Sequence, residues 1–251
     1  MAPATLDFTC NICGRAVLAC PISRIERETV SCRCGSTLRT RSVIYALSLR
    51  LFGRALPLPD FPRDKTISGV GLSDQKVYSK ALARKFDYRN TYLDKAPRLD
   101  IANPSGEGGF DFLISSEVLE HVPPLVDRAF RGMASLLKPG GALIFSVPYD
   151  LEPTTREHFP DLFEFQILEF GGAPVLLNRA RDGTLSVYDK LVFHGGKGQV
   201  VEMRVFGFDD VLRQLAQAGF RDITTLDHDA PEFGIIHSNP VGRIISATRG
   251  A

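Results

Sequence analysis

Apolar and polar residues follow two different periods along this chain, and the segments with each period alternate from about residue 65 onward. Two short and almost entirely apolar runs, at 110–115 and 142–147, are typical of strands buried on both faces of a sheet. Between them the apolar residues recur at helical spacing, at Leu125, Ala129, Met133 and Leu136. Pro123 and Pro124 suit the first turn of this helix. The order strand, helix, strand predicts a crossover between two parallel strands.

The same alternation continues on both sides of this unit. We expect further strands at 65–70, 86–93, 98–102, 222–226 and 243–248. We expect further helices at 78–85 and after Asp209, a favoured capping residue, with Gly219 at the end of the second. Repeated β and α units predict an α/β protein with a doubly wound, mostly parallel sheet that binds ligands at the C-terminal ends of its strands.

The first 60 residues have a different pattern. A helix is expected at 40–52, and the proline-rich segment 54–65 is typical of a linker. We therefore expect an N-terminal segment at 1–60 and a main domain at 61–251. The stretch 31–58 contains several arginines and no acidic residue. Its helix is either a basic surface for RNA or a docking helix whose arginines stay solvated or pair elsewhere, and the second interpretation is favoured.

Four of the five cysteines form two close pairs, Cys10 with Cys13 and Cys32 with Cys34, separated by 18 residues. Two tight turns that each present two thiolates are the layout of a zinc ribbon. We expect these four cysteines to hold one structural zinc ion, with no open position for chemistry. Two alternatives remain open: Cys20 replaces one of the ligands, or all five cysteines are unligated thiols in an apolar patch.

Composition restricts the class of protein further. The chain has 251 residues, of which 44% are hydrophobic, and its 30 basic residues nearly balance its 29 acidic ones. A protein that binds mainly nucleic-acid phosphates usually carries a clear basic excess. No apolar run approaches the roughly 18 residues that span a bilayer, and the N-terminus lacks the features of a secretory signal. We therefore expect a cytoplasmic protein without membrane contact, whose cysteines are thiols or metal ligands.

Two segments in order, FDFLISSEVLEHV and LLKPGGALIFSVP, resemble the fourth and fifth strands of class I S-adenosylmethionine-dependent methyltransferases. The likeness is greatest to the branch that methylates small molecules and quinone or sugar intermediates. The resemblance implies a seven-stranded Rossmann-like sheet with an antiparallel final strand, and S-adenosylmethionine as cofactor. It covers about forty residues directly, and the expected order of elements extends it from residue 66 to the end of the chain.

The glycine-rich turn of that family departs from the usual pattern here. The family commonly has G-x-G-x-G after the first strand, whereas this chain keeps Gly69 and Gly71 and continues with Ser73 and Asp74. Two glycines still let the backbone approach the methionine part of the cofactor. At the end of the second strand, where the family usually has an acid for the ribose, this chain has Asn90, whose amide is able to bond a diol.

Four more residues fall at cofactor positions of the family. The resemblance implies that Asp100 accepts a hydrogen bond from the adenine amine and that Ile101 packs on the ring. Ser116 and Glu117 follow the fourth strand, beside the reacting methionine. The alternative for Asp100 is a surface turn, and the alternative for the two glycines is an ordinary tight turn.

Histidines are the candidates for acid–base chemistry. A methyl acceptor needs a base only if it must lose a proton, and histidine is the natural base near neutral pH. His194 ends an apolar run, His158 follows the fifth strand, and His121 follows the fourth strand, where it is able to brace the loop. We assign His194 and His158 as candidate catalytic residues and expect the insert at 149–207 to select the substrate. Its aromatic residues are either substrate contacts or a small core: Phe159, Phe163, Phe165, Phe170 and Tyr188.

Three functions are compatible with these patterns. The first is methylation, at oxygen, of a small molecule or glycan. The second is methylation of RNA held by the zinc ribbon and its arginines, which the balanced charge disfavours. The third is a binding protein that keeps the fold without activity, which the reduced glycine turn suggests.

Overall fold

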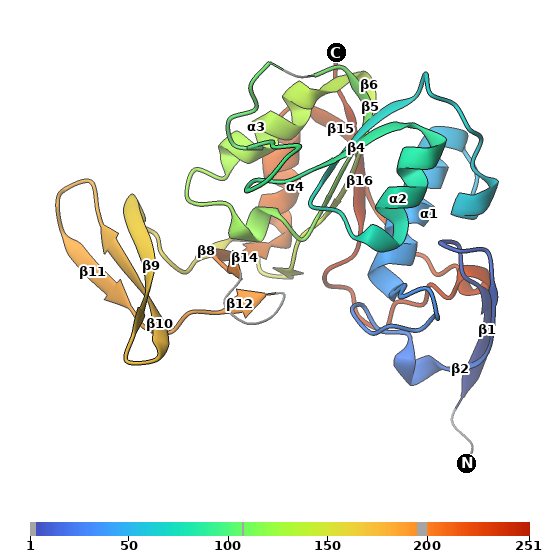
Figure 1. Ribbon diagram of the computed structural model, residues 1–251, viewed down its shortest axis with the longest axis horizontal. Coiled ribbons are helices and arrows are strands. Elements are labelled where there is room, and N and C mark those ends of the chain that lie inside the picture. The colour runs from blue at the N-terminus through green and yellow to red at the C-terminus, as the bar shows by residue number, and fades with distance from the viewer. Residues whose placement is uncertain (1–3, 107, 195–199) are drawn as a thin grey trace.

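The computed structural model describes residues 4–106, 108–194 and 200–251, and within them the centre of the fold is a six-stranded mixed sheet (Figure 1). From one edge to the other its strands are β15 (Phe220–Thr225), β16 (Ile245–Arg249), β6 (Leu137–Ser146), β5 (Phe110–Ser116), β3 (Ser68–Leu72) and β4 (Asp87–Thr91). β4, β3, β5 and β6 pair in parallel, whereas β16 is antiparallel to both β6 and β15. The predicted parallel crossover from β5 to β6 is confirmed.

Four α-helices cover the two faces of this sheet (Figure 1). They are α1 (Leu38–Phe52), α2 (Lys76–Lys85), α3 (Asp127–Leu136) and α4 (Phe208–Gln217). Successive strand residues point to opposite faces. Phe112 and Ile114 therefore pack into the core that contains α1 and α2, whereas Leu113 packs into the core that contains α3 and α4. Both cores are apolar because the parallel strands are covered on both sides.

The N-terminal segment shares the core of the sheet. It contains the hairpin of β1 (Thr5–Thr9) and β2 (Ala16–Pro21), and then α1, whose residues Val43 and Leu47 are buried against the sheet. The apolar core is thus continuous from the hairpin to β5 and β6. The boundary at residue 60 stays a prediction, and the helix predicted at 40–52 is confirmed with a start two residues earlier.

The arginines of this segment bond within the protein. Arg41 is fully buried and donates to the Gly234 carbonyl at 2.8 Å, while Arg50 donates to the Asp222 carbonyl at 2.6 Å. Arg39 is also buried. This is the arrangement that the docking-helix interpretation expects.

The insert forms a separate small sheet that extends away from the central one (Figure 1). Its meander consists of β9 (Glu164–Phe170), β10 (Ala173–Arg179) and β11 (Leu185–Tyr188). Shorter strands flank it: β7 (Tyr149–Asp150), β8 (Arg156–Glu157), β12 (Phe193–His194), β13 (Val200–Val201) and β14 (Arg204–Gly207). Phe159, Phe165 and Tyr188 belong to the small core of the insert, whereas Phe163 and Phe170 are exposed. Most of the predicted aromatic set is therefore packing.

Four short 3-10 helices complete the described secondary structure: η1 (Ile22–Arg24), η2 (Leu58–Asp60), η3 (Leu119–His121) and η4 (Pro231–Phe233). Within the described residues, no helix combines the length and apolar character needed to cross a bilayer.

The short edge strand expected at 98–102 is not formed, so the sheet has six strands within the described residues and not seven. The segment meets the edge of the sheet through one isolated bridge, between Tyr92 and Arg98. The Asp100 carboxylate then accepts a hydrogen bond from the Ala102 amide at 3.0 Å. Such a side-chain turn competes with a strand, so the chain bends before a ladder forms.

The helix predicted at the two prolines begins later, at Asp127. A proline disfavours the helical conformation of the residue before it, so Pro124 restricts Pro123. Leu125 then has a φ of 72° and is 52% exposed, so it is not part of the buried face. The other three residues of that face are buried as predicted: Ala129, Met133 and Leu136.

The predicted cap of α4 is also corrected. Gly207 is the N-cap residue, and Asp209 lies inside the first turn without a capping hydrogen bond. A carboxylate there still favours the positive end of the helix dipole. Gly219, with a φ of 93°, follows the helix as predicted.

Candidate functional site

The C-terminal ends of β3, β4 and β5 meet at one edge of the sheet. Gly71 in β3 is in register with Asn90 in β4 and with Ile114 in β5. Ser73 and Glu117, just beyond β3 and β5, have φ values of 56° and 60°. This left-handed conformation is uncommon for residues with a side chain and often occurs at functional sites. The structure thus brings the predicted residues of β3, β4 and β5 to one edge.

The turn after β3 closes around a buried carboxylate. Asp74 accepts hydrogen bonds from the Tyr78 hydroxyl at 2.8 Å and from the Tyr88 hydroxyl. A Cβ on Gly71 would lie 2.0 Å from the Tyr88 oxygen and 2.2 Å from Asp74, so only glycine fits there. A Cβ on Gly69 would overlap the ring of Phe112 in the core. Burial raises the pKa of Asp74 to about 7 despite the two tyrosine donors.

Asn90 holds this turn. Its Oδ1 accepts from the Asp74 amide at 2.8 Å, and its Nδ2 donates to the Asp74 carbonyl at 2.8 Å and to the Tyr92 hydroxyl at 3.1 Å. Both amide protons are used, so only acceptor capacity remains for a ligand. The predicted ribose contact of Asn90 stays a prediction, with bracing of the turn as its visible role.

Asp100 and Ile101 lie in the bend that replaces the edge strand expected at 98–102. Asp100 accepts the Ala102 amide through one oxygen, and the side chain is half-buried. Ile101 is buried in the core with Val70 and Met133. Asp100 therefore uses one carboxylate oxygen to shape the bend, and Ile101 contributes to the core. The predicted adenine contacts of both residues stay predictions.

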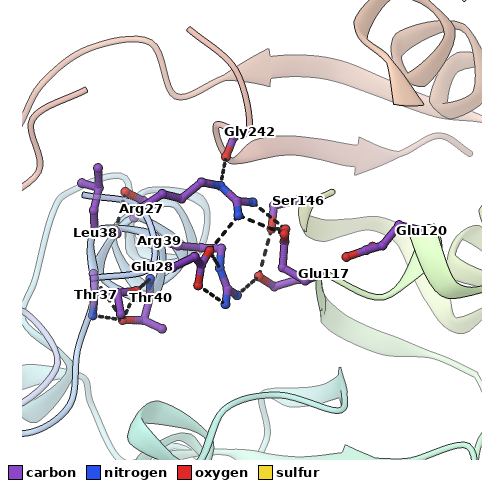
Figure 2. Close-up of polar contacts among 12 residues, drawn as sticks. Arg27, Glu28, Thr37, Leu38, Arg39, Thr40, Glu117, Glu120, Ser146 and Gly242 are labelled. Atoms are coloured by element: carbon purple, nitrogen blue, oxygen red, sulfur yellow. Dashed lines mark hydrogen bonds and ion pairs between the residues drawn. The ribbon is translucent and has the colours of Figure 1, made fainter. Parts of the chain in front are cut away.

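Side chains of the N-terminal segment reach the end of β5 (Figure 2). Arg27 forms a two-pronged ion pair with Glu117, with distances of 2.6 and 2.9 Å. Arg39 donates to the Ser116 hydroxyl at 2.7 Å and to both carboxylate oxygens of Glu28, at 2.6 and 2.8 Å. The candidate cofactor edge thus carries two guanidinium groups and two carboxylates.

The charged groups of this network influence one another's ionisation. Burial disfavours the ionised form of Glu117, but Arg27 outweighs it and holds the pKa of that carboxyl below its ordinary value. Ser146 adds a hydrogen bond to Glu117 at 2.9 Å. Beside this network a hollow opens between Arg39 and the loop of Asn239 and Gly242.

A second group of ionisable side chains joins η3 to the insert. His158 Nε2 and His194 Nε2 each lie 2.8 Å from a carboxylate oxygen of Glu202. The rings of His121 and His194 are 5.3 Å apart and nearly perpendicular. Both predicted catalytic histidines therefore share one carboxylate, and His121 adjoins them. We call Glu120, His121, His158, His194 and Glu202 the histidine cluster.

Glu120 is the most deeply buried member of the histidine cluster. Its side chain is fully buried, and neither carboxylate oxygen has a hydrogen-bond donor among the described residues. Burial raises its pKa well above the ordinary value, and the nearby charge of Glu117 adds to the shift. Figure 2 shows the Glu120 side chain beyond Glu117, so this member of the histidine cluster lies near the end of β5.

The four predicted cysteine ligands also come together. The Sγ atoms of Cys10, Cys13, Cys32 and Cys34 all lie within 4.8 Å of one another, with 3.7 Å between Cys10 and Cys34 and 3.8 Å between Cys13 and Cys32. Tetrahedral bonds of about 2.3 Å to zinc give sulfur–sulfur distances of about 3.8 Å. The geometry of this thiol cluster therefore suits a four-coordinate zinc ion.

The surroundings of the thiol cluster suit a charged centre. The Cys34 thiol and the Ser36 hydroxyl donate to the Cys10 sulfur and lower its pKa to about 4. The buried guanidinium of Arg41 lies close enough for its charge to interact with the cysteines. Cys20 contacts the Pro21 carbonyl and is not a member of the group.

The protein has a mostly parallel sheet with charged groups at the C-terminal ends of its strands. Proteins of this α/β class bind their ligands at that edge of the sheet. Residues 61–225 match a family described as "Methyltransferase domain". This match spans about two thirds of the chain, so the chain belongs to that family and is a methyltransferase. The prediction that this protein is a methyltransferase is thus confirmed.

The comparison with solved structures matches several proteins that are named as methyltransferases. A putative S-adenosylmethionine-dependent methyltransferase from Listeria monocytogenes has 16% identity and a TM-score of 0.48, covering 84% of this chain and 100% of that one. The sugar N-methyltransferase KedS8 from Streptoalloteichus has 15% identity and a TM-score of 0.47, covering 84% and 88%. The 1,6-didemethyltoxoflavin-N1-methyltransferase of Burkholderia thailandensis has 14% identity and a TM-score of 0.45, covering 85% and 78%. The comparison with curated protein sequences gives no significant match.

Several residues of the site were not predicted from the sequence. Glu202 is an acid between apolar residues, a pattern that indicates burial with a partner. Glu120 precedes His121 directly and was visible only as part of the family motif. Arg27 and Arg39 gave no signal of a contact with β5, because their partners are 90 and 77 residues away.

Proposed function

We propose that this protein transfers a methyl group from S-adenosylmethionine to a hydroxyl of a small molecule or glycan. The observation that carries this proposal is the histidine cluster beside the end of β5. It places two imidazoles, His158 and His194, on one carboxylate, Glu202. A hydroxyl acceptor requires such a proton acceptor.

The residues at the sheet edge suit this donor. The methionine part of S-adenosylmethionine has one carboxylate and one ammonium, and the edge offers guanidinium groups at Arg27 and Arg39 and a carboxylate at Glu117. The free oxygen of Asp100 is a suitable acceptor for the adenine amine. Gly69 and Gly71 keep the turn after β3 tight, although side chains of the protein fill the space beside them.

The sulfonium cofactor supplies an already activated methyl group, so the protein mainly has to orient the acceptor. The acceptor oxygen forms the new C–O bond while the S–C bond breaks and its electron pair stays on sulfur. The hydroxyl proton passes to His158 or His194. Glu202 stabilises the imidazolium that forms, because its carboxylate already bonds both rings.

The thiol cluster has a structural role in this proposal. Four thiolates leave a zinc ion no open position, and the ion would join the hairpin to the segment with Cys32 and Cys34, which lies between Arg27 and Arg39 in the chain. The insert at 149–207 selects the acceptor. A nucleic-acid acceptor is disfavoured because Arg39, Arg41 and Arg50 bond within the protein. The cytoplasmic location stays a prediction.

The proposal is tested by incubating the protein with methyl-labelled S-adenosylmethionine and separate pools of sugar nucleotides, phenols, amines and structured RNA. We expect label in a hydroxyl compound, and a rate that is reduced in His158→Gln. Label transferred only to RNA or only to amines would contradict the assignment of the acceptor. The matched control is His228→Gln, which changes a histidine that is 55% exposed and outside the histidine cluster.

A further inference from the structure

Three side chains of the histidine cluster form a ligand set. One carboxylate oxygen of Glu120 and one ring nitrogen each of His121 and His194 lie within 4.8 Å of one another. The Glu120 Oε1 and His121 Nε2 atoms are 3.6 Å apart. Bonds of about 2.1 Å to a metal ion would bring such atoms to about 3.4 Å from one another. The Glu120–His121 pair is therefore already close to a binding distance, and the His194 nitrogen would have to move inward by at most about 1.4 Å.

Glu120 provides the independent observation that a cation belongs here. A fully buried carboxylate is costly unless it is paired or coordinates a metal. Both oxygens of Glu120 are buried without a hydrogen-bond donor among the described residues. His121 Nε2 lies 3.6 Å from Glu120 Oε1, which is too long for a hydrogen bond that would satisfy the carboxylate.

The two histidines are held in the way that metal-binding histidines usually are. His121 Nδ1 lies 2.9 Å from the Val201 carbonyl, so that nitrogen donates and the lone pair is on Nε2, the atom that faces Glu120. His194 Nε2 lies 2.8 Å from Glu202. A carbonyl or carboxylate on the second nitrogen fixes the orientation of the ring and makes it a better ligand.

We propose that Glu120, His121 and His194 bind a divalent transition-metal ion. Two imidazoles and one carboxylate are ligands for zinc, iron and manganese, and three protein ligands leave positions open for water or substrate. Glu202 is a positioning residue, because it orients His194 without being part of the ligand set. The site is separate from the thiol cluster, whose four sulfurs suit a closed structural ion.

The role of this ion rests on the proposed function. An ion at this place would bind acceptor oxygens and lower the pKa of a hydroxyl among them. His194 would then be a ligand, and His158, which bonds the other oxygen of Glu202, would take the proton. The preferred acceptor would have two neighbouring oxygens that chelate the ion, such as a vicinal diol or a catechol.

Manganese is the probe, because soft thiolates favour zinc over manganese, and the thiol cluster is filled beforehand with only one equivalent of zinc per chain so that the second site stays free. The full-length protein is titrated with Mn²⁺, and the free ion is followed by electron paramagnetic resonance. We expect one Mn²⁺ per chain in the parent protein and at least about 100-fold weaker binding in Glu120→Gln. Glu202→Gln should weaken binding by about 10- to 100-fold, the range for an outer partner.

Two further variants keep the result interpretable. His194→Gln changes a side chain that is 36% exposed, so it should fold even if Glu120→Gln does not, and it should also lose Mn²⁺. His228→Gln should bind Mn²⁺ like the parent. The inference is overturned if the parent does not bind Mn²⁺ at millimolar concentration, or if both ligand variants bind it as the parent does.

Calorimetry with S-adenosylmethionine on the same samples separates this inference from the proposed function. A protein that binds Mn²⁺ but not the methyl donor keeps the metal site and contradicts the methyl-transfer proposal. A protein that binds the donor but not Mn²⁺ contradicts the metal site and keeps the methyl-transfer proposal.

Discussion

The thiol cluster and the histidine cluster are built in opposite ways. The four cysteines lie within 25 residues of chain, and their four sulfurs are able to fill every position of a tetrahedral ion. The histidine cluster draws on η3, β12 and the segments around His158 and Glu202, and two of its histidines are partly exposed. Four identical thiolates that complete a tetrahedron suit a structural role, whereas a mixed set of acids and imidazoles with positions left open suits chemistry. The two clusters should therefore respond differently to the loss of one member.

The largest expected effect is on the thiol cluster. Cys13→Ser should release zinc and lower the free energy of unfolding by more than about 4 kcal/mol, because a structural metal site contributes directly to folding. Metal analysis and thermal denaturation measure both effects. Cys20→Ser is the matched control and should keep the zinc. A parent protein without bound zinc would contradict the structural role.

The histidine cluster should lose activity and keep stability. His158→Ala should reduce turnover by about 10²-fold, because the proton acceptor is lost, while the affinity for S-adenosylmethionine stays the same. Steady-state kinetics and calorimetry test the two parts. An equal loss of turnover in His228→Ala would show that the effect is not specific to the histidine cluster.

Asp74 is a buried acid whose carboxylate accepts hydrogen bonds from two tyrosines, whereas the carboxylate of Glu120 accepts none from the described residues. The pKa of Asp74 is about 7 in the folded protein and about 3.8 when unfolded, so the folded state binds more protons between these values. Stability from this group is therefore present at low pH and is lost as pH rises from about 4 to 7. Asp74→Asn should reduce the fall in stability between pH 5 and pH 8 by about 2 kcal/mol. Urea unfolding at both pH values measures it, and an unchanged difference would contradict the shifted pKa.

The smallest effect is expected at the bend beyond the sheet edge. Asp100→Ala should weaken the binding of S-adenosylmethionine about 10-fold, because a buried adenine amine loses its acceptor. Stability should change little, since the side chain is only half-buried. Calorimetry checks the affinity, and an unchanged dissociation constant would remove Asp100 from the site.

The two clusters also differ in how far apart their members lie in the chain, and this difference explains what the sequence was able to predict. Cys10 and Cys34 are close in the chain, so their spacing indicates a common ligand. Glu120 and Glu202 are 82 positions apart, and no local pattern links them. The β–α order predicted the parallel sheet because buried runs and helical spacing are local. The bend at Asp100 and the bracing role of Asn90 depend on side-chain hydrogen bonds, to Ala102, Asp74 and Tyr92, that periodicity does not encode.

The central claim is that the edge formed by β3, β4 and β5 binds the methyl donor. A calorimetric titration of the parent protein and of Glu117→Gln with S-adenosylmethionine tests it directly. The account predicts saturable binding of one donor per chain by the parent, and clearly weaker binding by Glu117→Gln, because the donor's ammonium loses its carboxylate partner. No binding by the parent at millimolar donor, or equal binding by both proteins, would contradict it.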